Sequence, residues 1–153
     1  MAIPDIAYTQ QLIDLAGHSP CAEYVSPASE VCTTNQQTLS HAINALAVGD
    51  FESAEREALK LSVRRGTKME KQIATVANAI ATSNCIAVEI DAMLFFHDKI
   101  ARQTGNKTDS DFYLCLPAIG LANIALHFGR LERDELDHSN VYCPADLLVN
   151  NGE

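Results

Sequence analysis

The sequence predicts an all-α protein, a single-domain bundle of five to seven helices around a long central helix at about residues 68–103. Three observations favour this fold: helix-capping residues recur along the chain, apolar residues repeat at three- and four-residue spacing, and the alternation typical of strands is nearly absent. The length of 153 residues is usual for one domain. We therefore assign residues 1–153 to a single helical domain.

Capping and helix-ending residues set the elements that precede the central helix. Gly49 follows an apolar stripe, and we expect it to end a helix in the left-handed conformation that glycine adopts without steric cost. Asp50 is a natural cap for the next helix, and Thr67 for the one after it. The helices expected before residue 68 are 4–16, 27–48 and 51–65.

The long central helix changes character near its middle. Ile73 and Ile80 lie on an apolar face of its N-terminal half. In the C-terminal half the same face carries Asn84, Asp91 and Asp98, while apolar residues surround much of the remaining circumference. We therefore expect the covering layer of neighbouring helices to change near residue 84, and we expect this polar ridge to be exposed.

Three shorter elements complete the expected bundle. An apolar segment spans 112–128, and Pro117 removes one backbone donor within it, so a helix either kinks there or begins there. Gly129 ends this segment. A short acidic helix over 131–138 and a last turn over 144–149 follow.

Two stretches of the chain resemble each other. Residues 45–52 (Ala-Leu-Ala-Val-Gly-Asp-Phe-Glu) and 125–132 (Ala-Leu-His-Phe-Gly-Arg-Leu-Glu) share an Ala-Leu pair, a glycine and a closing glutamate, a pattern that indicates two helix–glycine–helix corners. The first, continued by Ser53 and Ala54, resembles the inter-helix turn of a tetratricopeptide-type hairpin over about residues 37–65. The resemblance implies a protein-binding helical hairpin and brings no catalytic residues.

Composition and charge exclude several classes of protein. A net charge of −9 argues against general affinity for nucleic-acid phosphates or anionic membrane surfaces, which need a surplus of Lys and Arg. The longest uncharged run, 72–88, is too short and too polar to span a bilayer. The five cysteines include no CxxC pair, and the N-terminal residues lack a secretion-signal profile. We therefore expect a cytoplasmic protein with reduced thiols.

The search for catalytic motifs indicates a protein that is not an enzyme. The chain lacks the glycine-rich phosphate loops, the GxSxG elbow and the HExxH zinc motif, so the sequence predicts neither a metal nor a cofactor. One alternative stays open. Glu89, Asp91, His97 and Asp98 could serve a small metal- or ligand-binding helical-bundle enzyme, because carboxylates and an imidazole can bind a metal or move protons.

The function that the sequence favours is a non-enzymatic protein-interaction module: an adaptor, a specific inhibitor or an immunity-type protein that binds and blocks a partner. If the two glycine corners lie at one end of the bundle, the acids that follow them form one acidic surface, which suits a basic protein partner. A homo-oligomer stays an open alternative, whereas we expect no direct binding of nucleic acid or membrane. The expected partner-binding residues are Glu52, Glu55, Glu57, Glu132, Asp134, Glu135 and Asp137.

A basic cluster offers a second candidate surface. Five of the eleven Lys and Arg residues lie within twelve positions. The cluster is either a solvated face at a helix end, where positive charge is favourable, or a docking patch for an acidic partner. Its members are Lys60, Arg64, Arg65, Lys68 and Lys71.

Overall fold

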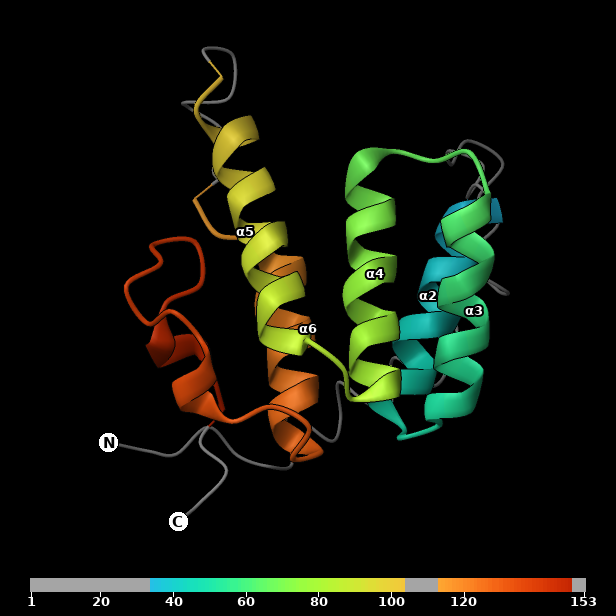
Figure 1. Ribbon diagram of the computed structural model, residues 1–153. Coiled ribbons are helices and arrows are strands. Elements are labelled where there is room, and N and C mark those ends of the chain that lie inside the picture. The colour runs from blue at the N-terminus through green and yellow to red at the C-terminus, as the bar shows by residue number, and fades with distance from the viewer. Residues whose placement is uncertain (1–33, 104–112, 150–153) are drawn as a thin grey trace, which may run out of the picture.

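A computed structural model describes residues 34–103 and 113–149, and these residues form an all-α bundle without strands (Figure 1). The predicted fold class is confirmed. The helix expected at 4–16 and the start of the one expected at 27–48 lie outside the described residues. The described elements are α2 (Thr34–Ala47), α3 (Phe51–Val63), α4 (Lys68–Thr82), α5 (Ile86–Ala101) and α6 (Leu116–His127), with 3₁₀ turns η4 (Arg133–Glu135) and η5 (Ala145–Leu147).

Helix α4 is the centre of the bundle. It packs against the α2–α3 hairpin on one side and against α5 and α6 on the other (Figure 1). Seven of its fifteen residues are buried, four of them alanines, whose small side chains allow close helix approach. The largest fully buried side chains around it are Leu46, Val76, Ile80, Ile90 and Met93.

The expectation of one continuous helix over 68–103 is wrong. The helix is interrupted between Thr82 and Ile86, where Ser83 and Cys85 both adopt left-handed backbone conformations with φ of 53°. The Asn84 N–H donates to the Ala79 carbonyl (3.0 Å), which closes the end of α4. This break lies near residue 84, where the layer of neighbouring helices was expected to change. Asn84 is exposed, as expected.

The corner between α2 and α3 is confirmed. Gly49 has φ of +78° and ends α2, and the Asp50 carboxylate accepts a hydrogen bond from the Ser53 N–H (3.1 Å). Thr67 caps α4 as expected, in a reciprocal capping box with Glu70. Helix α3 ends at residue 63, two residues earlier than expected, because the next residue is already extended.

The C-terminal elements are shorter than the sequence predicted. Helix α6 begins at Leu116, so Pro117 lies in a first turn, where its missing donor costs nothing. The acidic helix expected over 131–138 is only the single turn η4, and the turn expected over 144–149 is η5. Leu131 and Leu136 are both buried. On an α-helix they would point about 140° apart, so a turn followed by extended chain buries both better.

Candidate functional site

The two glycine corners meet at the same end of the bundle. A Cβ atom on Gly49 would lie 3.1 Å from the ring of Phe128, the residue before Gly129. The Phe51 and Phe128 rings pack edge to face with centroids 5.3 Å apart. The segments that carry the predicted acids therefore leave from neighbouring points.

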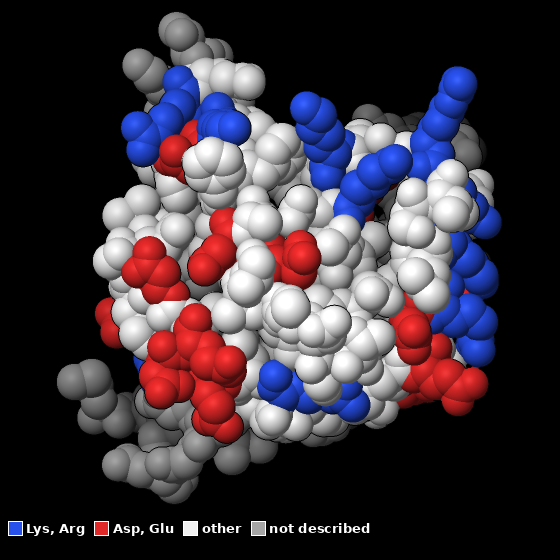
Figure 2. All heavy atoms as spheres, in the orientation of Figure 1, with Lys and Arg blue, Asp and Glu red and all other residues white. Residues whose placement is uncertain are grey.

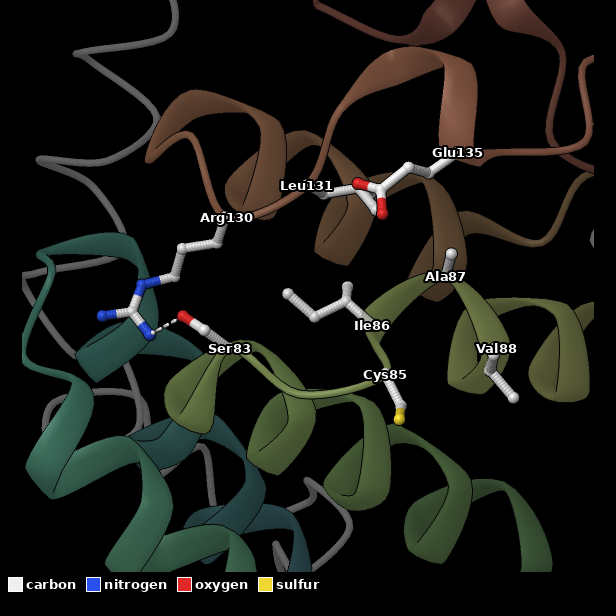
Figure 3. Close-up of a pocket in the computed structure, with 8 residues that line it drawn as sticks. All are labelled: Ser83, Cys85, Ile86, Ala87, Val88, Arg130, Leu131 and Glu135. Carbon is white, nitrogen blue, oxygen red and sulfur yellow. Dashed lines mark hydrogen bonds between the residues drawn. The ribbon is translucent and has the colours of Figure 1, made fainter.

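Arg130 joins these corners to the break between α4 and α5. Its guanidinium carbon lies 3.4 Å from the centroid of the Phe51 ring, and Nη1 donates to the carbonyls of Ile80 and Ala81 (both 2.8 Å). Nη1 also donates to Ser83 Oγ (2.7 Å), as Figure 3 shows. These carbonyls belong to the last turn of α4, beyond which the helix supplies no regular donors four residues further on. The Ile80 carbonyl also accepts a hydrogen bond from the Ser83 N–H (3.2 Å). One side chain thus ties the end of α4 and Ser83 to the first residue of α3.

Two hollows follow one another between α5 and residues 130–142. The first, of about 180 Å³, lies between the start of α5 and the chain around Arg130 and Glu135 (Figure 3). The second, of about 430 Å³, lies between the rest of α5 and residues 137–142. We call the two together the α5 furrow. Its lining residues include Val88, Asp91, Phe95, Glu135, Asp137 and Val141.

The middle of the α5 furrow brings two carboxylates together. Partial burial raises the pKa of Asp91 above its usual range, and the negative charge of Asp137 raises it further. Hydrogen bonds from Ser139 lower the pKa of Asp137, so that carboxylate stays ionised. Among the described residues no Lys or Arg pairs with either acid. This part of the furrow therefore carries two carboxylates without a Lys or Arg partner.

The far end of the furrow is neutralised. Arg102 Nε donates to both carboxylate oxygens of Asp98 (2.7 Å each), and the Tyr142 hydroxyl donates to Oδ1 (2.9 Å). The Arg102 hydrogen bond is the main reason that the pKa of Asp98 is lowered. The Tyr142 ring packs edge to face on the buried His97, with centroids 5.0 Å apart. The Asp98 carboxylate thus binds Arg102 on its own helix and attaches the C-terminal segment to α5 through Tyr142.

Apolar side chains border the charged middle of the furrow. Val88 is 64% exposed, Phe95 63% and Val141 70%. Val88 and Phe95 are seven residues apart and so lie on one face of α5, on either side of Asp91. Lys99 Nζ lies 4.3 Å above the centre of the Phe95 ring. The site therefore combines apolar contact area with a central negative charge.

Several of the predicted partner-binding acids have local structural roles. Glu132 and Glu135 form a capping box around η4, in which the Glu135 carboxylate accepts from the Glu132 N–H (2.7 Å). Glu57 pairs with Lys60 (2.6 Å) and, at 3.9 Å, with Arg56. Of the remaining predicted residues, Glu52, Asp134 and Asp137 are exposed and Glu55 is half-buried.

The seven predicted acids do not form a continuous patch on the face that Figure 2 shows. Acidic atoms gather over the C-terminal segment and α5 on the left and over α3 on the right, with neutral and basic atoms between them (Figure 2). The C-terminal acids instead share the left-hand side with the carboxylates of α5. Sequence reasoning had treated Asp91 and Asp137 separately, because no local pattern signals a contact between positions 46 residues apart.

The alternative constellation on α5 is dispersed. Asp91 is exposed, whereas His97 is buried and Asp98 is engaged by Arg102 and Tyr142. Within residues 34–103 and 113–149, no group of three or more His, Cys, Asp or Glu side chains could hold a metal ion.

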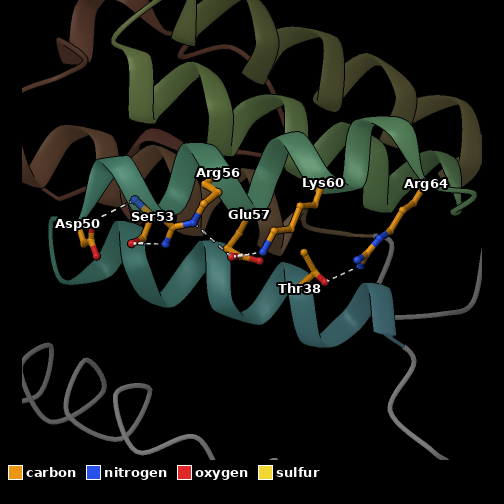
Figure 4. Close-up of polar contacts among 7 residues, drawn as sticks. All are labelled: Thr38, Asp50, Ser53, Arg56, Glu57, Lys60 and Arg64. Atoms are coloured by element: carbon orange, nitrogen blue, oxygen red, sulfur yellow. Dashed lines mark hydrogen bonds and ion pairs between the residues drawn. The ribbon is translucent and has the colours of Figure 1, made fainter.

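The basic cluster is partly used within the α2–α3 hairpin. A polar chain of contacts links Asp50, Ser53, Arg56, Glu57 and Lys60 along α3 (Figure 4). Arg64 Nη1 donates to Thr38 Oγ1 (3.0 Å) and so fastens the end of α3 to α2 (Figure 4). The other members of the cluster, at positions 65, 68 and 71, are exposed.

Comparisons with known proteins found no match: no family model, curated protein or solved structure resembles this chain significantly. The tetratricopeptide-type resemblance of residues 37–65 therefore stays a prediction. In the part of the chain that the structure describes, no helix is long and apolar enough to cross a membrane.

Proposed function

We propose that this chain is a non-enzymatic helical interaction module that binds and blocks a basic protein partner, as an adaptor, a specific inhibitor or an immunity-type protein does. The observation that carries the proposal is the pair Asp91 and Asp137, which lie close enough for one charge to raise the pKa of the other and have no Lys or Arg partner in the described chain. Exposed apolar side chains border this pair.

A basic partner relieves a cost that the free protein carries. Two neighbouring carboxylates repel each other, and a Lys or Arg placed between them replaces that repulsion with attraction. The net charge of −9 acts over a longer range and speeds the encounter with a positively charged protein. A partner with a basic active site, such as a nuclease or another nucleic-acid-binding protein, fits this chemistry.

The test is to capture partners from the native cell with the whole protein and to measure their association rates by stopped flow. Reversing the charges of Glu132, Asp134 and Glu135 together should slow association severalfold at low salt, and the defect should shrink as salt screens the charges. Because Glu132 and Glu135 also hold η4, Asp134→Lys alone is the cleaner variant. Asp146→Lys, an equal charge change in the same exposed C-terminal segment, is its matched control.

The proposal predicts a purified partner whose association rate depends on salt and on these acids. Association that ignores both the reversals and the salt would show that acidic residues do not guide binding. Turnover of a substrate by the purified chain, with activity that follows Asp91 or His97, would instead favour the enzyme alternative.

A further inference from the structure

The outward face of α5 has the spacing of a helix-binding surface. Its exposed residues lie three or four, seven and eleven positions after Val88, and among the described elements no other helix covers this stripe: Val88, Asp91, Ala92, Phe95 and Lys99. Val88 and Phe95 are about 10.5 Å apart along the helix axis. That distance is one heptad, the repeat at which a second helix presents successive apolar residues.

The other wall of the furrow limits how a partner can lie. Val141 and Asp137 stand beside the second half of α5, and Glu135 stands beside its start. A segment bound in the furrow therefore runs along α5 between the helix face and residues 135–141. An extended strand would place its side chains at a spacing that does not match the stripe on α5.

The charges along the furrow are ordered. Asp91 lies midway along α5 between the two apolar positions and Asp137 lines the same hollow as Asp91, whereas Lys99 and Arg102 lie toward the C-terminal end of α5. Asp98 already neutralises Arg102. The surface is therefore complementary to a segment with a cation at its centre and an acidic or neutral residue beside Lys99.

We infer that the α5 furrow docks one amphipathic helix of the basic partner, with apolar residues one heptad apart on Val88 and Phe95 and an Arg or Lys between them facing Asp91 and Asp137. The inference rests on the proposed function and names the surface and the partner segment. The apolar contacts hold the complex, and the central cation sets the register.

The probe is a synthetic helical peptide with leucines one heptad apart, an arginine midway between them and a fluorophore at one end. Its binding to the full chain is measured by fluorescence anisotropy. A second peptide with glutamate in place of the arginine tests the central charge. We expect the arginine peptide to bind and the glutamate peptide to bind about tenfold more weakly or worse.

Three variants locate the peptide. Phe95→Ser should weaken binding about tenfold, because it removes the apolar contact. Asp91→Asn should weaken it about three- to tenfold while preserving the side-chain shape. Asp146→Asn makes the same chemical change outside the furrow and should leave the affinity unchanged. Circular dichroism of each variant checks that the helices persist.

Failure of the inference can be separated from failure of the proposed function. Absence of peptide binding, or binding that Phe95→Ser and Asp91→Asn leave unchanged, overturns the inference that the α5 furrow binds a helix. If the captured partner nevertheless depends on Asp134 and on salt, the proposed function stands on a different surface. Dimerisation of the chain that Phe95→Ser abolishes also overturns the inference, because a second copy then occupies the furrow.

Discussion

Two kinds of helix ending occur in this molecule, and they are made in different ways. At the glycine corners, Gly49 and Gly129 adopt φ of +78° and +61°, and each N–H donates to a carbonyl three residues back. At the break between α4 and α5, Ser83 occupies the equivalent position with φ of 53° and makes the same bond. The backbone geometry is shared, but only glycine adopts it without steric cost.

The ending without glycine relies on tertiary contacts. Arg130 supplies them: its side chain bonds the last turn of α4 and the Ser83 hydroxyl. The same residue contributes its backbone N–H to the Gly129 corner (2.9 Å to the Ala125 carbonyl) and stacks on Phe51 beside the Gly49 corner. A local signal fixes the glycine corners, whereas a contact across about 50 positions fixes the break.

Removing that contact should have the largest effect. Arg130→Ala deletes three hydrogen bonds and the stacking on Phe51, and we expect it to lower the free energy of unfolding by about 3 kcal/mol in chemical denaturation. Arg130→Lys keeps the charge but lacks the planar fork, so it should recover only part of the loss. A negligible effect of Arg130→Ala would mean that the break stands without its side chain.

Strain at the glycine corners should come next. Gly49→Val places a branched side chain at positive φ against the Phe128 ring, and we expect a loss of about 2 kcal/mol in the same denaturation assay. Gly129→Ala also introduces strain, but nothing lies within 4 Å of its new Cβ, so it should cost about 1 kcal/mol. Equal losses at the two corners would show that contact with Phe128 contributes nothing.

The cap at the first glycine corner gives a smaller effect that depends on pH. Hydrogen bonds from Ser53 lower the pKa of Asp50 below its usual value, so its stabilising contribution is complete above the unfolded-state pKa of about 4 and is lost as the pH falls through the folded-state value. Asp50→Ala should lower the melting midpoint by a few degrees near neutral pH. That difference should shrink in acid; a constant difference would contradict the assignment.

The contrast between the two endings explains how much of the fold the sequence could predict. The ends at Gly49 and Gly129 and the caps at Asp50 and Thr67 depend on neighbouring residues, and all four were predicted correctly. The ending at Ser83 depends on Arg130, so the interval 68–103 was predicted as one helix. Only the change of polar face near residue 84 signalled that the helix's surroundings change there.

The same reasoning applies to the candidate site. The acids of the C-terminal segment and the Asp91–Asp98 ridge were visible as separate patterns. The two groups of acids lie side by side because the chain after Gly129 turns back along α5, where the Tyr142 hydroxyl donates to Asp98. No local sequence pattern predicts this turn. Tyr142 carried no sequence signal of this role, since its partner lies 44 positions away.

A glycine introduced into the break should stabilise the protein. Cys85 is exposed and has φ of 53°, and its thiol makes only a weak bond to the Asn84 side chain (3.2 Å). Cys85→Gly removes the left-handed strain and should raise the free energy of unfolding by up to about 1 kcal/mol, seen as a higher denaturation midpoint. Destabilisation would show that the Cys85 side chain contributes more than its strain costs.

Asn84→Leu should have the smallest effect. Asn84 is exposed, and its contribution to the break is its backbone N–H, which any residue except proline supplies. The substitution removes only the acceptor of the Cys85 thiol, so the free energy of unfolding should change by less than about 0.5 kcal/mol. Denaturation of Asn84→Leu beside Arg130→Ala compares a residue within the break with the distant residue that supports it. If Asn84→Leu proved the more destabilising of the two, local side chains rather than Arg130 would hold the break.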